Sequence, residues 1–209
     1  MKRQETFETK QPMLVKCHSG RVYIYVNETE VKETVRRQTG EETFEDVEVT
    51  RYRYDVDDVV PVSQTDEGIL DALVDQVKGY ISEYDKSDKV NVFYINGQKM
   101  EWLYKNDRSG LQMRLEAEKA NGIEQTTLWS GLLSFHLTVD DADKMRVKLE
   151  IYAANCFDNT ASHTAAVEAY RTVTQDATAE SRIQSVMDYD YTVGYPEAPD
   201  FPISYEKLG

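Results

Sequence analysis

The sequence predicts an α+β protein: an N-terminal antiparallel β module with a covering helix, followed by a ββα-ββα unit that contains one long helix. Three observations lead to this prediction. β-Branched and aromatic residues alternate with polar residues before residue 65, an amphipathic stripe follows over residues 66–84, and Asn96-Gly97 joins two apolar runs ahead of a helix signal. The predicted domains are residues 1–65, the covering helix 66–84, and an α+β domain 85–209 with an extended C-terminal tail.

The N-terminal module is predicted from strand patterns around short turns. Residues 13–18 and 21–26 flank Ser19-Gly20 and indicate a hairpin. Residues 27–42 are charged and lack apolar periodicity, so they are either a long exposed connection or a ragged extension of the second strand. Between residues 43 and 62 the apolar positions change face after Val49, which indicates a bulge or a break into two strands.

The covering helix opens at Asp66-Glu67 and carries the clearest apolar stripe in the chain. A partner-binding helix would show the same pattern, but a core-facing helix is favoured because the preceding strands need cover. The stripe consists of Ile69, Leu70, Leu73, Val74, Val77, Tyr80, Ile81 and Tyr84.

The C-terminal domain begins with a hairpin and a helix. Asn96-Gly97 is the typical pair of a type I′ turn between strands 90–95 and 98–103. The next helix is expected to start near residues 106–109, to turn Leu111, Met113 and Leu115 inward, and to end at Asn121-Gly122.

A second hairpin and the longest helix follow. Residues 126–129 and 132–137 form strands around Ser130-Gly131, and Thr138 or Asp140 caps a helix that runs to about residue 172, with a kink near residues 158–160. After a short helical turn at residues 183–187, the Tyr- and Pro-containing residues 188–209 form an extended tail, which lies on its own domain or on a neighbour.

Charge restricts the classes of partner. The chain has 38 acidic and 24 basic residues, a net charge of −14, which repels nucleic acid and anionic membranes. The spread of acidic residues is interpreted as a solvated surface, with a basic partner as the alternative. The residues after Met1 lack the apolar core of a signal peptide and no long apolar run follows, so we expect no membrane partner and synthesis in the cytoplasm.

Residues with catalytic or metal-binding chemistry are isolated, so we expect no catalytic residue, metal or cofactor. Cys17 and Cys156 are expected to be reduced thiols, and Cys156 and His163 would share a helix face two turns apart, too far for a nucleophile and its base. His136 is expected to be partly buried and hydrogen-bonded. Two acidic groups are interpreted as strand-end and helix-start charges: Asp55, Asp57 and Asp58, and Asp140, Asp141 and Asp143.

Aromatic residues are the remaining candidates for a site. Trp102, Tyr104, Trp129 and Phe135 could form a platform for carbohydrate or bases, although burial as core is favoured. The residues predicted for a partner or glycan surface are Trp102, Trp129, Tyr189, Tyr191 and Tyr195.

Several short motifs lie between about residues 85 and 196. They are Asn91 and Phe93, the Ile95-Asn96-Gly97 turn, Trp102-Leu103, Arg108, Gly110-Leu111, Thr127-Leu128-Trp129, the Tyr152, Cys156 and His163 spacing, and Tyr189-Asp190-Tyr191-Thr192. With these motifs the chain resembles an uncharacterised family of phage and prophage proteins, number 4376 among the domains of unknown function. Tyr104, Asn106 and Phe157 depart from the family pattern.

The resemblance implies a non-enzymatic protein associated with the virion or tail, made in the bacterial host cytoplasm and acting through protein contacts. Such contacts are expected at the C-terminal tail and at the exposed strand edges of the first module. A homo-oligomer is compatible with the sequence. The alternatives are a cytoplasmic assembly chaperone for tail fibres, and a glycan-binding module or small hydrolase that uses Trp102, Trp129 and His136.

Overall fold

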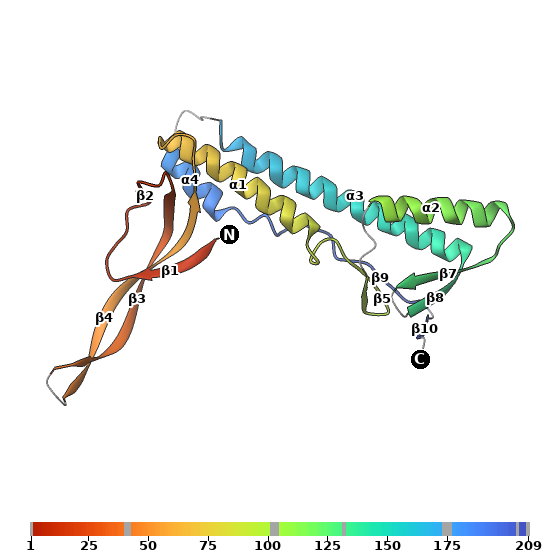
Figure 1. Cartoon of the computed structure of the whole chain (residues 1–209), viewed down its shortest axis with the longest axis horizontal. Coiled ribbons are helices and arrows are strands. Elements are labelled where there is room, and N and C mark those ends of the chain that lie inside the picture. Colours follow the sequence, from red (N-terminus) through yellow and green to blue (C-terminus); the bar gives the residue numbers. More distant parts are fainter. Residues whose placement is uncertain are drawn as a thin grey trace. The chain divides into compact units, whose positions relative to one another are not determined.

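The computed structural model describes residues 2–39, 43–100, 105–130, 133–172, 177–203 and 205–207. It confirms the α+β class, with an antiparallel sheet at the N-terminus and the predicted ββα-ββα order in the C-terminal half (Figure 1). The chain divides into two compact units, Met1–Tyr80 with Ala166–Tyr189, and Ile81–Ala165 with Asp190–Gly209. No sequence pattern indicated that residues 166–189 return to the first unit.

The first unit contains a four-stranded antiparallel sheet in the order β1-β4-β3-β2. Two strands are long, β3 (Val22–Gln38) and β4 (Phe44–Val59), and two are short, β1 (Arg3–Phe7) and β2 (Leu14–Lys16). The pairing of β2 with β3 confirms the predicted hairpin. For residues 27–42, the structure agrees with the second predicted alternative, an extension of the strand, and not with a long connection, because β3 continues to Gln38 and pairs with β4 along its length.

The irregularity of the sheet lies in β3, so its predicted position after Val49 is wrong. The register shifts between Val26 and Thr29 of β3, with Asn27 at a φ of 57°. This extra residue moves the inward-facing positions of β3 from even to odd numbers. Strand β4 shows no register shift of its own. Its apolar positions change face in the sequence because apolar side chains occupy both of its faces.

Aromatic rings explain the second apolar face of β4. Tyr54 packs edge-on against Phe7 of β1 and Tyr25 of β3, with ring centroids 6.1 and 5.9 Å away. The opposite face of the sheet carries buried aliphatic residues, which include Val22, Ile24, Val26 and Val59.

Helix α1 (Asp66–Lys86) confirms the predicted covering helix. The side chains of Gln76 and Tyr80 donate hydrogen bonds to the Asp57 carboxylate of β4, at 3.0 Å and at 3.3–3.4 Å. Asp57 is only 4% exposed, so its interpretation as a solvated strand-end charge is wrong. The stripe is buried as predicted at Ile69, Leu70, Leu73, Val74, Val77 and Ile81.

Helix α4 (Ala179–Asp188) is longer than the short turn predicted there, and the Thr178 side chain caps it by accepting from Ser181 N–H. Its Arg182 is 5% exposed and forms an ion pair of 2.5 Å with Glu67 of α1. The Asn27 amide at the bulge donates to Asp188 at 2.7 Å. These contacts hold α4 in the first unit.

The second unit starts with strands β5 (Phe93–Ile95) and β6 (Gln98–Met100), which form the predicted hairpin. Asn96 and Gly97 both have positive φ angles, 50° and 74°, as a type I′ turn requires. The strand begins later than predicted because residues 87–91 form hydrogen-bonded turns.

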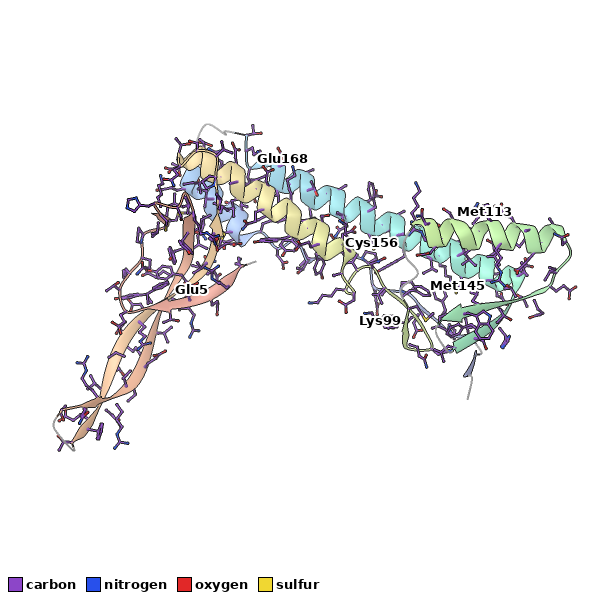
Figure 2. All side chains as sticks on the ribbon, viewed as in Figure 1. Glu5, Lys99, Met113, Met145, Cys156 and Glu168 are labelled. Atoms are coloured by element: carbon purple, nitrogen blue, oxygen red, sulfur yellow. The ribbon has the colours of Figure 1, made fainter. Side chains whose placement is uncertain are left out.

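Helix α2 (Lys105–Ala120) ends before Gly122, whose φ is 67°, and confirms the predicted stop. Leu115 is buried, but Met113 is 71% exposed, so the prediction that Met113 faces inward is wrong (Figure 2). Residues two positions apart point to different sides of a helix, and Leu111 and Leu115 occupy the inner side.

Strands β7 (Gln125–Ser130) and β8 (Leu133–Thr138) form the second predicted hairpin and lead into α3 (Val139–Ala169). Thr138 caps α3 by accepting from the Asp141 N–H at 3.0 Å. The helix is continuous through residues 158–160, where a kink was predicted.

The C-terminal tail lies on its own unit, which decides between the two predicted alternatives. Strand β9 (Asp200–Phe201) pairs in parallel with β5, and β10 (Tyr205–Lys207) pairs antiparallel with β8. Phe201 is 7% exposed and belongs to the core of this unit, which also includes Phe93, Leu115, Phe135, Met145, Leu149 and Tyr152.

Candidate functional site: a two-stranded β-arm

The far parts of β3 and β4 form a two-stranded ribbon, which we call the β-arm and define as residues 31–38 and 44–51 (Figure 1). Strand β1 pairs with β4 only from Tyr52 onward, and β2 pairs with β3 only at Val22–Ile24. Within the described residues, therefore, the β-arm has two strand edges to which no further strand is paired. Such edges are where another chain can add a strand.

One face of the β-arm carries four half-buried valines. Val35 lies directly opposite Val47, and Val31 and Val49 lie on the same face. A shallow hollow of about 340 Å³ lies over this face and is lined in part by Val35, Val47 and Val49. This face continues the one that is buried under helices nearer the body of the unit.

Charged side chains of the β-arm are arranged in complementary positions. Arg36 lies opposite Asp46 and Arg37 opposite Glu45. Lys32 forms an ion pair with Glu48 at 3.0 Å. The arm has four basic and four acidic residues, so its net charge is zero in a chain of net charge −14.

Residues 27–42 had two possible interpretations from sequence, because neither a period of 2 nor a period of 3.6 appears among their apolar residues. A signal was nonetheless present: charges of opposite sign are mirrored about the segment 39–43, as in Arg36 with Asp46 and Arg37 with Glu45. Cross-strand charge pairs of this kind favour a hairpin in register. Figure 2 shows side chains standing on both faces of the arm.

Three predicted surface residues of the tail have partners within their own unit. Tyr195 stacks on His163 with ring centroids 5.8 Å apart, and its hydroxyl lies 2.9 Å from Thr160 Oγ1. Tyr191 contacts Tyr84, and Tyr189 contacts Tyr170. Burial raises the pKa of Tyr195 above its usual range. The three rings therefore hold the tail in place, and a role in partner binding stays a prediction.

Trp129 and His136 are more exposed than expected. Trp129 is 52% exposed, so its interpretation as core is wrong, whereas Phe135 is fully buried as predicted. His136 is exposed because it alternates with buried Phe135 and Leu137 on β8, and its Nδ1 lies 3.2 Å from Thr127 Oγ1. Trp102 and Tyr104 lie outside the described residues.

His163 and Cys156 are the described residues of α3 that were considered above as a possible catalytic pair. His163 is buried, and its Nε2 donates to the Val193 carbonyl at 2.9 Å. Cys156 is buried beside Tyr152. The desolvation that comes with this burial raises the pKa of the Cys156 thiol. Among the residues that the structure describes, no group of three or more His, Cys, Asp or Glu side chains could hold a metal ion.

No family model, curated protein or solved structure matches the chain. The search for membrane spans also gave none: no helix in the described ranges is both long enough and apolar enough to cross a bilayer.

Proposed function

We propose that the protein is a non-enzymatic structural or accessory component of a phage or prophage particle, and that it binds a different protein of that particle through the β-arm. The resemblance of residues 85–196 to the phage and prophage family supports the context. The observation that carries the binding role is the β-arm itself, a charge-neutral ribbon with a valine face and two edges to which the described residues add no strand.

A lone two-stranded ribbon is only marginally stable in water. The β-arm therefore costs conformational entropy that its own contacts offset poorly, unless a partner covers it. An extended segment of a partner can add main-chain hydrogen bonds at an edge, and its apolar side chains can cover Val31, Val35, Val47 and Val49. Full burial of one valine contributes roughly 1.5–3 kcal/mol.

Charge identifies the kind of partner. Two copies of a chain with a net charge of −14 repel each other, which favours a monomer. A neutral or basic protein does not meet this repulsion when it approaches the neutral arm. The partner is therefore a different protein with an apolar, extended segment, and we expect the isolated chain to be a monomer.

Particle composition tests the context of the proposal. The particles produced by the phage or prophage that encodes the chain would be purified and quantified by mass spectrometry. We expect the protein in a fixed ratio to the other particle proteins. Its absence from the particle overturns the structural role and favours an assembly chaperone in its place.

A pair of variants on β4 tests the arm. Val47→Asp places a carboxylate on the valine face, whereas Thr50→Asp places one on the opposite face, across from Lys32. We expect Val47→Asp to lower incorporation into particles about tenfold, equivalent to about 1.4 kcal/mol, while Thr50→Asp has little effect and both variants keep the melting temperature of the parent. Equal incorporation of the two variants, or sedimentation of the isolated parent chain as a dimer through the arm, overturns the proposal.

One observation favours a second candidate function, glycan binding. Trp129 is 52% exposed on β7. Thr127 lies two positions before it on β7 and is paired with His136 of β8, so both side chains face the same side of the sheet as Trp129. An exposed indole ring beside hydrogen-bonding groups suits the apolar face of a sugar. Trp129→Ala with His136→Ala should abolish retention on a glycan array without a change in melting temperature, and unchanged retention rejects this candidate.

A further inference from the structure

The second unit contains a pocket of about 240 Å³, which plays no part in the proposed arm interaction. It lies between the end of α1, the turn that follows, the first turn of α2 and the middle of α3. This volume is many times the roughly 10–15 Å³ of probe-occupied space that one water molecule needs. This is enough room for a small organic molecule.

The polar wall of the pocket is cationic. Among the described residues, Lys86, Lys105 and Arg108 line it together with one carboxylate, Asp85. Asp85 accepts a hydrogen bond from the Thr160 hydroxyl at 2.9 Å. Arg108 forms an ion pair of 3.1 Å with Glu150. With both carboxylates counted, three cations face two anions, an excess of positive charge in a chain of net charge −14.

The position of two of these cations adds to the positive electrostatic potential of the pocket wall. Lys105 is the first residue of α2 and Arg108 lies in its first turn, where the N–H groups and the helix dipole favour a negative ligand. A ligand carboxylate at this wall would therefore meet charged donors and the positive end of a 16-residue helix.

The opposite wall is apolar. Tyr152 and Val90 are buried, and the Tyr152 hydroxyl donates to the Val90 carbonyl at 2.8 Å, so the polar atom of this ring is already satisfied. Phe157 also lines the pocket and is 69% exposed. An apolar group of a ligand would cover the Phe157 ring without burying an unpaired polar atom of Tyr152.

We propose that this pocket binds a small organic anion, in which a carboxylate contacts Lys105 and Arg108 and an apolar or aromatic body packs on Phe157 and Tyr152. The two walls explain this class, since a purely inorganic anion would leave the apolar wall uncovered and a neutral apolar molecule would leave the excess positive charge of the cationic wall uncompensated.

Titration of the full-length ¹⁵N-labelled protein with benzoate, and separately with inorganic phosphate, tests the proposal by NMR. We expect benzoate to shift amides of residues 85–91, 105–108 and 152–157 and to bind more tightly than phosphate. Lys105→Gln should weaken benzoate binding about tenfold, as expected for loss of one charge-assisted contact. Lys144→Gln, an exposed lysine in the second turn of α3, is the matched control and should leave affinity unchanged.

Phe157→Ala tests the apolar wall separately, because the side chain is largely exposed and its removal is not expected to unfold the protein. It should weaken benzoate binding several-fold and leave phosphate binding unchanged. Phosphate binding as tight as benzoate binding, equal losses in Lys105→Gln and Lys144→Gln, or the absence of benzoate shifts at these amides would each overturn the proposal.

Discussion

Asn96 and Ile203 exchange two hydrogen bonds although they lie 107 residues apart: the Asn96 side-chain amide donates to the Ile203 carbonyl, and the Ile203 N–H donates to Asn96 Oδ1 at 3.1 Å. Asn96 is also the first central residue of the type I′ turn, with a φ of 50°. Asn96 thus closes the hairpin through its backbone conformation and holds the C-terminal tail beside it through its side chain. The requirement for positive φ can be separated from the tail contact by mutation.

Asn96→Gly keeps the turn, because glycine adopts positive φ without strain, but removes both side-chain hydrogen bonds to Ile203. Two such bonds contribute roughly 1–3 kcal/mol. We expect amide hydrogen exchange of Asp200, Phe201 and Ile203 to accelerate by roughly tenfold or more, while that of α2 stays unchanged. Lys99→Ala, in the same hairpin, is the control, and equal exchange in both variants contradicts a holding role for Asn96.

Substitution by alanine is expected to have opposite effects on stability at the two glycines of α1. A Cβ on Gly68 would lie 2.3 Å from the Ser63 carbonyl oxygen, whereas a Cβ on Gly79 has no neighbour within 4 Å. Gly68→Ala should therefore destabilise the protein by about 1–3 kcal/mol. Gly79→Ala should stabilise it by about 0.5–1 kcal/mol, since alanine restricts the unfolded chain and favours helix. Urea unfolding of both variants measures the signs, and a shared sign contradicts the close approach at Gly68.

Local stereochemistry made some of the fold predictable. Asn96-Gly97, Gly122 and the α1 stripe were located correctly because each signal is complete within a few neighbouring residues. The bulge was assigned to the wrong strand because alternation in β4 was interpreted with one buried face, whereas the rings of Phe7 and Tyr25 cover its second face. That cover comes from distant strands and leaves no local pattern.

The candidate sites were less predictable for the same reason. To predict the β-arm, the pairing of Arg36 with Asp46 across a turn must be known. To predict the pocket, the meeting of α1, α2 and α3 must be known. The tail could be recognised as extended, but its pairing with β5 and β8 is non-local. Trp129 was interpreted as core because composition does not reveal that β7 is the outer strand of its sheet.

Asp57 is predicted to stabilise the first unit through its buried contacts. Asp57→Ala removes the acceptor for the Gln76 amide and the Tyr80 hydroxyl, and the Asp58 N–H, now 2.9 Å from Asp57 Oδ1, also loses its side-chain partner. Leaving such groups without acceptors should cost about 2–4 kcal/mol of unfolding free energy. Asp46→Ala on the exposed arm should change it by less than about 0.5 kcal/mol. Similar losses in the two variants contradict the buried network.

The two cysteines should differ in reactivity. Cys156 is 6% exposed, and desolvation raises the pKa of its thiol, whereas Cys17 is partly exposed. At about pH 8 we expect iodoacetamide to modify Cys17 at least about tenfold faster than Cys156, because the thiolate is the nucleophile. Peptide mass spectrometry measures both rates, and unfolding in guanidinium should bring them together.

The same pKa shift gives a stability effect with a definite sign. A thiol whose pKa is raised on folding binds its proton more tightly in the folded state, so its contribution is full below the unfolded pKa of about 8.5. That contribution is lost as the pH rises from there through the higher folded pKa. The parent should therefore lose stability relative to Cys156→Ala over this alkaline range, measured by urea unfolding at each pH. A constant difference between the two proteins would mean that the thiol ionises equally in the folded and unfolded chains, which its burial beside Tyr152 opposes.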